Sequence, residues 1–178
     1  MREAATQGRT HGSDGRRRRT SALTAEARAR RGSAEFLPSF AALQERVRDA
    51  CAAQEEWQAK VVAGVRAALE FCAADPAAAQ ALTVTARREA VGGRQPDQEV
   101  IAYFAQMLVD VAPAEKDFPA PAAVATIESI ATVVRGHLVA GTADRLPAAG
   151  ADLIYLTLLS RLGTEGLARW VDVGPGAS

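Results

Sequence analysis

The chain has 178 residues, 48% hydrophobic and 24% charged, with a formal net charge of zero, a length that suits one domain with one core. Residues 1–35 hold nine Arg against four acidic residues, whereas residues 36–178 hold twelve basic residues against seventeen acidic ones. The body therefore offers no basic surface for a phosphate backbone, which leaves the first 35 residues as the place for any nucleic-acid affinity.

The segment 1–34 is dominated by four consecutive arginines, Arg16, Arg17, Arg18 and Arg19. Its low hydrophobicity and high charge predict a disordered, solvated basic tail. The arginines could instead neutralise phosphates, which would give weak, non-specific DNA binding without readout of bases. Both interpretations are kept. Residues 174–178 are also expected to be disordered.

The domain over residues 35–173 is predicted to be all-α, because its apolar residues recur every three or four positions and strand-like alternation is rare. One amphipathic stripe opens it, formed by Phe36, Phe40, Leu43, Val47 and Cys51. The next helix runs from about Trp57 to near Asp75. Gly64 lies inside that helix, where glycine is unfavourable, so we expect a neighbour to pack closely against it.

Asp75 and Pro76 predict the start of a third helix, because Asp can accept from free backbone N–H groups and Pro suits the first helical position. This helix is expected to run to about residue 91, before two glycines. Pro96 opens another helix through Val111, and a proline-rich loop over 112–121 follows. Two long helices, over 121–141 and 146–163, and a short turn complete the pattern, which indicates six to seven helices.

The last long helix is apolar around most of its circumference, at Leu153, Ile154, Leu156, Leu158, Leu159 and Leu162. A helix that faces one core and water needs fewer apolar residues, so we expect a second subunit to cover the excess. The predicted homodimer interface consists of Ile130, Val134, Leu138, Leu153, Leu156 and Leu159. A central core helix in a monomer is the alternative.

The residues with chemical potential do not form a catalytic pattern. Cys51 and Cys72 lack metal-ligand spacing and are interpreted as reduced core residues of a cytoplasmic protein. His11 and His137 lie in the tail and in a late helix, so they do not pair for a metal. No apolar run of about 18 residues and no signal peptide is present, which predicts no membrane contact. We therefore expect no enzyme, no metal and no cofactor.

The order of these signals resembles the regulatory domain of the TetR (tetracycline-repressor-like) family of bacterial transcription regulators over about residues 35–173. The resemblance is carried by Trp57 at the start of the second helix, by VVAGVRAALEFCAADPAAAQAL with Phe71 ahead of Asp75 and Pro76, by ATIESIATVVRGHLVAG, and by LSRLGTEGLARW. It implies a helical domain that binds a small apolar or amphipathic effector and dimerises through its last two long helices.

The DNA-binding half of the family departs from the pattern. Family members begin with a three-helix unit that contains a helix-turn-helix, whereas residues 7–34 have too few apolar residues for such a core. REAA at 2–5 and FLPSFAAL at 36–43 nevertheless look like the edges of that unit. Our hypothesis is that residues 7–34 are its coding stretch read in a shifted frame. A genuine tail is the alternative.

The effector pocket is expected among bulky apolar residues with a few polar handles, namely Trp57, Val61, Phe71, Tyr103, Phe104, Met107, Val134 and His137. Each of them could instead be an ordinary core residue. The chain is therefore interpreted as a dimeric ligand sensor whose DNA-reading half is absent or corrupted. The alternative is a helical interaction protein that forms a heterodimer with an intact relative and sequesters it.

Overall fold

The structure is a computed structural model that describes residues 34–85, 96–111 and 119–173, and every element in these ranges is a helix. The order is a first helix over 34–52, α2 (Trp57–Ala74), α3 (Pro76–Gln80), the π-helix η1 (Ala81–Thr85), α5 (Pro96–Val111), α6 (Ala120–Ala140), the 3-10 helix η2 (Ala143–Ala149) and α7 (Gly150–Val173). The all-α prediction is confirmed for this part of the chain. The predictions made for 1–33 and 174–178 lie outside it.

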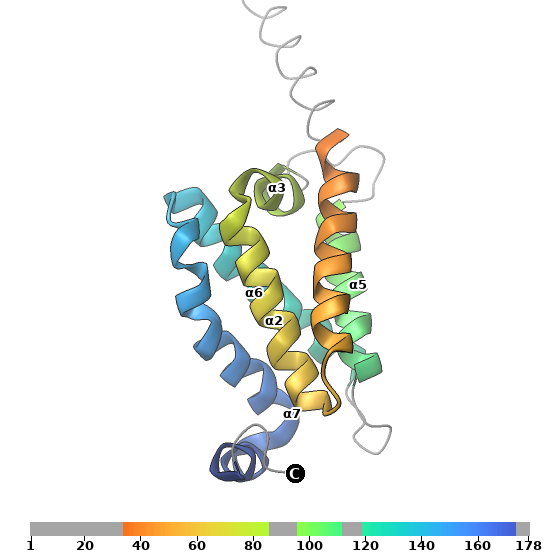
Figure 1. Cartoon of the computed structure of the whole chain (residues 1–178), viewed down its shortest axis with the longest axis vertical. Coiled ribbons are helices and arrows are strands. Elements are labelled where there is room, and N and C mark those ends of the chain that lie inside the picture. Colours follow the sequence, from red (N-terminus) through yellow and green to blue (C-terminus); the bar gives the residue numbers. More distant parts are fainter. Residues whose placement is uncertain (1–33, 86–95, 112–118, 174–178) are drawn as a thin grey trace, which may run out of the picture.

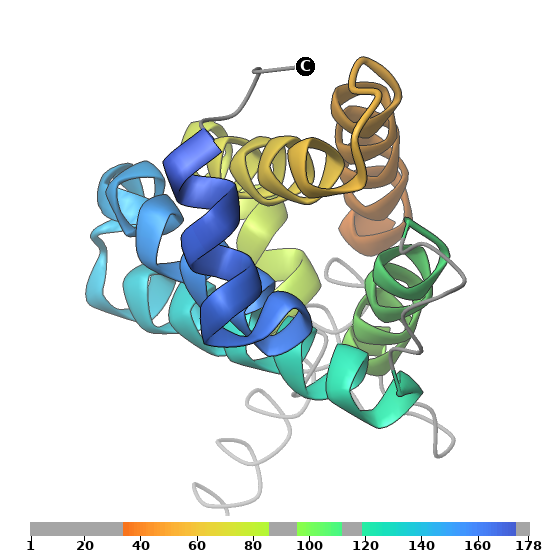
Figure 2. The same cartoon turned by 90° about the horizontal axis from the view of Figure 1, so that it is seen from below.

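The long helices surround the middle of the fold (Figures 1 and 2). The first helix and α2 are consecutive and antiparallel, and α5 lies alongside the first helix (Figure 1). Seen from below, α2 and α6 lie on opposite sides of the fold, with the first helix and α5 toward one end and α7 toward the other (Figure 2). Residues from all of these helices can therefore meet in the middle of the domain.

Three clusters of buried side chains hold the helices together. The α7 cluster consists of Val61, Ala105, Leu108, Ala123, Ile154, Leu158 and Leu167. The η2 cluster consists of Leu69, Cys72, Ala79, Val134, Leu138, Ala143, Leu146 and Leu153. The first-helix cluster consists of Phe36, Leu43, Val47, Cys51, Ala67 and Leu82. Since α2 contributes to all three, it is the central helix of the fold.

The close packing predicted at Gly64 is confirmed, and the neighbour is the first helix. A Cβ atom built on Gly64 would lie 3.0 Å from Cys51 Sγ and 3.5 Å from Val47 Cγ1. The absence of a side chain therefore lets the two antiparallel helices approach each other. The cap at Asp75 is also confirmed, because its Oδ1 accepts from the Ala78 N–H at 2.9 Å.

Three helix boundaries differ from the sequence prediction. The helix expected to run from Pro76 to about residue 91 is α-helical only to Gln80 and continues as the π-helix η1, while residues 86–95 lie outside the described ranges. The stretch 146–149 is 3-10 helix. The turn expected after Gly163 is helical instead: Gly163, at φ 64° and ψ 178°, breaks α7 and the chain then forms further helical turns.

Three residues of the interface predicted from the sequence are buried within one chain. Val134, Leu138 and Leu153 are each only 5% exposed, because they pack together in the η2 cluster within one chain. The number of apolar residues around α7 did not indicate that η2 and α2 cover this side of the helix. Ile130 and Leu159 are partly buried against the η2 and α7 clusters respectively.

Exposed apolar side chains nevertheless remain on the last two long helices. Leu156 is 58% exposed and Tyr155 is 51% exposed, both on α7, and Val139 on α6 is 74% exposed. In α7, residues 153, 154, 157 and 158 are buried, whereas 155 and 156 point away from the core. The exposed apolar surface of these two helices is thus smaller than the sequence predicted, and it lies on the sides of the helices that face away from the core.

Among the described helices, α6 is long and apolar enough to cross a membrane by length and composition alone. Core helices of soluble proteins pass the same test. In α6, 17% of the apolar window is buried inside the domain, at Ala123, Val134 and Leu138. The absence of membrane contact stays a prediction.

Candidate functional site

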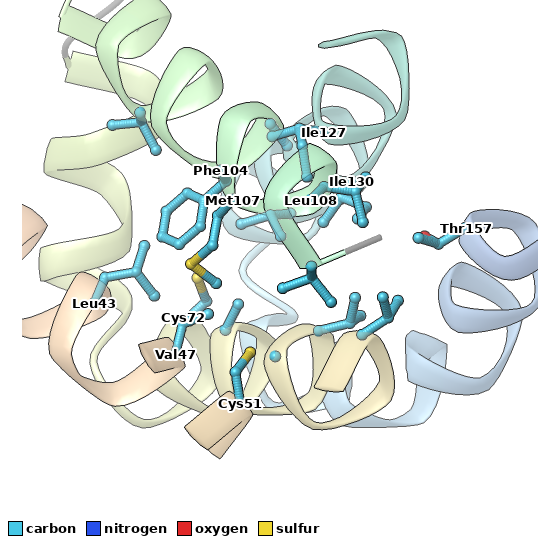
Figure 3. A pocket seen from close by; sticks show the side chains of 18 of the residues that line it. Leu43, Val47, Cys51, Cys72, Phe104, Met107, Leu108, Ile127, Ile130 and Thr157 are labelled. Atoms are coloured by element: carbon cyan, nitrogen blue, oxygen red, sulfur yellow. The ribbon is translucent and has the colours of Figure 1, made fainter. Parts of the chain in front are cut away.

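A central cavity of about 130 Å³ lies where the three clusters meet (Figure 3). The first helix contributes Leu43, Val47 and Cys51, and α2 contributes Lys60, Val61, Gly64, Val65, Ala68 and Cys72. Thr83 of η1 and Val100, Phe104, Met107, Leu108 and Val111 of α5 continue the wall. Ile127, Ile130, Ala131 and Val134 of α6 and Thr157 of α7 complete it. Residues far apart in the sequence therefore surround one space.

The two threonine hydroxyls on this wall bond to the backbone. The Thr157 hydroxyl donates to the Leu153 carbonyl at 2.7 Å, one turn earlier in the same helix. The Thr83 hydroxyl likewise donates to the Ala79 carbonyl at 2.7 Å. Such bonds use the hydroxyl hydrogen locally. The described wall therefore presents mainly hydrocarbon and sulfur to an occupant.

The two cysteines of the chain both line the cavity as free thiols. Burial raises the pKa of Cys72 to about 12. Burial also raises the pKa of Cys51, with a smaller opposing effect from the nearby Lys60 ammonium, and the Cys51 thiol donates to the Lys60 carbonyl at 3.3 Å. Because the thiolate is the nucleophile, these protonated thiols act as small polarisable apolar groups.

The residues predicted for the pocket divide into two groups. Val61, Phe104, Met107 and Val134 line the cavity, and Figure 3 shows Phe104 and Met107 extending from α5 toward its centre. Trp57, Phe71, Tyr103 and His137 are not part of the described lining. The second group has other contacts, which explain why its members do not line the cavity.

These other contacts are specific. Trp57 lies under the guanidinium of Arg161. The ring of Tyr103 packs edge-on against Phe104, with 5.1 Å between ring centroids. His137 Nδ1 lies 3.0 Å from Thr142 Oγ1 and 3.2 Å from the Thr142 carbonyl oxygen, which places the imidazole at the end of α6. Phe71 packs partly buried against both the η2 and first-helix clusters.

The pocket residues predicted from the sequence do not include the two thiols and the two hydroxyls of the lining. Cys51 and Cys72 had been interpreted as core, and Thr83 and Thr157 were not singled out. The one available signal was Gly64, which predicted a close approach to α2 and so the participation of another helix. Gly64 alone does not identify the neighbouring helix, because the contact with Cys51 and Val47 depends on how the two helices pack in three dimensions.

A second, larger cavity of about 420 Å³ lies between α2 and α7. It is lined by Gln54, Ala59, Val62, Ala63, Arg66, Ala151, Ile154, Tyr155, Leu158 and Leu167. Arg66, Ala151 and Tyr155 are exposed, so this cavity is a groove on the surface. Its buried members are Ile154, Leu158 and Leu167, and Gln54, Arg66 and Tyr155 are its polar members. It is lined mainly by α2 and α7, whereas the central cavity has walls from five described helices and η1. We therefore take the central cavity as the candidate site.

Ionisable groups that could do chemistry are sparse in the described ranges. No three His, Cys, Asp or Glu side chains there lie close enough to hold a metal ion. Asp97 is buried at the start of α5, but it does not line the central cavity. The site can bind an apolar molecule, because its walls are apolar and come from several helices.

No family model, no curated protein and no solved structure matches this chain. The functional conclusion consequently depends on the geometry of the cavity and of the exposed helix faces.

Proposed function

We propose that residues 35–173 are the ligand-sensing, dimerising regulatory domain of a TetR-type transcriptional regulator. One observation carries the proposal: the two helices that bear the exposed apolar side chains also form part of the cavity wall. Ile130 and Val134 of α6 and Thr157 of α7 line the cavity, while Val139 and Leu156 are exposed on the same two helices.

The exposed side chains supply the dimer interface. Full burial of a large apolar side chain stabilises an association by about 1.5–3 kcal/mol, and a side chain that is already half-buried contributes about half of that. Leu156 and Tyr155 are adjacent on α7, and Val139 lies near the end of α6. The proposed interface consists of Val139 with the small exposed residues Gly136 and Ala140 on α6, and of Leu156 on α7, each packed against a second copy of the chain.

The shared helices provide the link between ligand and dimer. Thr157 and Leu156 are neighbours in the sequence, yet Thr157 is 1% exposed on the cavity side and Leu156 is 58% exposed on the outer side. An occupant that shifts α7 at Thr157 therefore also moves Leu156. A ligand changes the dimer geometry only if it binds the two arrangements with different affinity.

The DNA-reading half is not assigned to the described helices. In the proposed regulator a DNA-binding unit precedes the first helix. We predict its remnant or a tail over residues 7–34, of which 7–33 lie outside the described ranges. The effector is proposed to bind in the central cavity, and the dimer to form through the outer faces of α6 and α7.

Light scattering after size exclusion tests the proposal. We expect the purified chain to be a dimer and the Leu156→Asp variant to be a monomer, because a charge at the interface centre would be buried without a partner. Leu37→Asp is the matched control, since Leu37 is also exposed, at 69%, but lies on the first helix. A wild-type monomer, or equal effects of both substitutions, would remove the basis for the proposal.

A further inference from the structure

We infer that the central cavity selects a small neutral molecule with a single aromatic ring. The inference deepens the proposed function and rests on it in one respect, because such a ring would be the effector of the proposed sensor. The binding itself is a property of the cavity and can be tested separately.

The volume of the cavity sets the size of the ligand. At about 130 Å³, its volume is close to that of an engineered apolar cavity of about 150 Å³ that binds benzene. It is well below the roughly 300–1,000 Å³ of pockets for drug-sized ligands. One six-membered ring fits this volume, whereas part of a second, fused ring would lie outside it and lose contact with the walls.

The sulfur atoms favour an aromatic ring over an aliphatic one. Cys51, Cys72 and Met107 reach the cavity from the first helix, α2 and α5 respectively, and Figure 3 shows the three side chains directed toward the same space. Polarisable sulfur makes favourable contacts with aromatic rings. Phe104 adds a ring that can pack edge-on or offset against the ligand.

The charge of the wall favours a neutral molecule. Lys60 is the one charged residue in the described lining, and the hydroxyls of Thr83 and Thr157 donate to backbone carbonyls. A carboxylate that enters this space loses its water and finds few donors in return. The ammonium of Lys60 could reverse this preference by pairing with an anion. The test therefore includes the anion benzoate.

The test uses calorimetric titration of the full chain with benzene, cyclohexane, naphthalene and benzoate. We expect benzene to bind at least tenfold more tightly than naphthalene or benzoate. Met107→Leu keeps a similar volume but removes the sulfur, so it should lower the ratio of benzene to cyclohexane affinity about two- to tenfold. An unchanged ratio would contradict the role of sulfur.

Two further variants locate the binding. Ala131→Leu fills the cavity and should abolish benzene binding, whereas Ala125→Leu, on an exposed turn of the same helix outside the lining, should keep it. Circular dichroism verifies that both variants remain folded. If Ala131→Leu is unfolded, Ala68→Leu on α2 makes the same test from the opposite wall. Retained binding in a folded, filled variant would overturn the inference.

The remaining outcomes separate this inference from the proposed function. Naphthalene binding as tightly as benzene would overturn the size limit. Benzoate binding that is tighter than benzene and lost in Lys60→Met would overturn neutrality. A dimer that binds none of the rings contradicts the ligand class and leaves the proposed dimeric regulator standing. A monomer that binds benzene supports the ligand class and contradicts the proposed function.

Discussion

The guanidinium of Arg161 lies over the ring of Trp57, with 5.2 Å between Arg161 Cζ and the ring centroid. Its Nη1 also donates to the Leu108 carbonyl at 2.8 Å. One side chain of α7 therefore holds α2 and α5 together. Burial lowers the pKa of Arg161 from its ordinary value, yet a guanidinium remains protonated. Trp57, predicted as a pocket residue, is a platform for this cation.

We expect Arg161→Met to lower the free energy of unfolding by about 2–3 kcal/mol, because it removes a charged hydrogen bond and a cation–π contact. Urea denaturation measures the change. A double-mutant cycle with Trp57→Leu should give a coupling of about 1 kcal/mol. A coupling near zero would mean that the indole contributes only packing.

The side chain of Asp75 should stabilise the start of α3 through a hydrogen bond to a residue three positions later. Removal of its cap in Asp75→Ala should cost about 1 kcal/mol of stability, because the Ala78 N–H loses its acceptor. Asp75→Asn should keep most of the stability, since Asn is an equally good cap. Thermal unfolding of the three proteins is sufficient. If the Asn and Ala variants lost the same free energy of unfolding, the side-chain oxygen would not be the stabilising group.

The contrast between Asp75 and the predicted interface indicates what the sequence could predict. The cap, the first-helix stripe and the helix class depend on residues within a few positions of one another, and all three were predicted. The burial of Leu153 depends on its packing with Leu69 and Leu146 in the η2 cluster. A count of apolar positions cannot distinguish cover by η2 and α2 from cover by a second subunit.

The same limit applies to the central cavity. Phe104 and Met107 were predicted to line it because bulky residues on a stripe point inward, and both do. Tyr103 shares their helix but packs edge-on against Phe40, with 5.7 Å between ring centroids. The contacts of Tyr103 and Phe104 depend on where the first helix lies. The sequence of α5 alone does not predict that position.

Gly64 should not tolerate a methyl group. In a helix interior Gly→Ala normally stabilises by about 1 kcal/mol, but the new Cβ would lie 3.0 Å from Cys51 Sγ. We expect Gly64→Ala to destabilise by about 1–3 kcal/mol, the usual cost of overpacking. The Gly64→Ala and Cys51→Ala double variant should be more stable than the sum of the single changes predicts. Simple additivity in urea denaturation would contradict the clash.

Gly136 is the matched control for that experiment. It lies in α6, it is exposed, and a Cβ there would meet nothing within 4 Å. Gly136→Ala should therefore stabilise the helix by about 0.5–1 kcal/mol. Because Gly136 lies on the proposed dimer face, the measurement belongs in the Leu156→Asp background, where association does not contribute. A loss of stability in that background would mean that the helix propensity argument fails at this position.

Alkaline pH should destabilise the domain through Cys72. Burial raises the pKa of its thiol from 9.0 to about 12, so between these values the unfolded chain loses a proton that the folded chain keeps. The folded state then binds more protons than the unfolded state, and stability falls as the pH rises, by about 1.4 kcal/mol per pH unit for one group. This contribution is fully present below pH 9.0 and is progressively lost toward pH 12.

The comparison of the wild type with Cys72→Ala isolates this effect, because other groups that titrate above pH 9 are common to both proteins. Cys72→Ala should be less stable at pH 7, since a buried side chain leaves a void beside the cavity. The difference between the two proteins should then shrink as the pH is raised from 8 to 10.5 in urea denaturation experiments. Parallel stability curves over this range would show that the Cys72 thiol ionises as easily in the folded domain as in the unfolded chain, and that it is not buried among the apolar side chains of α2 and α6.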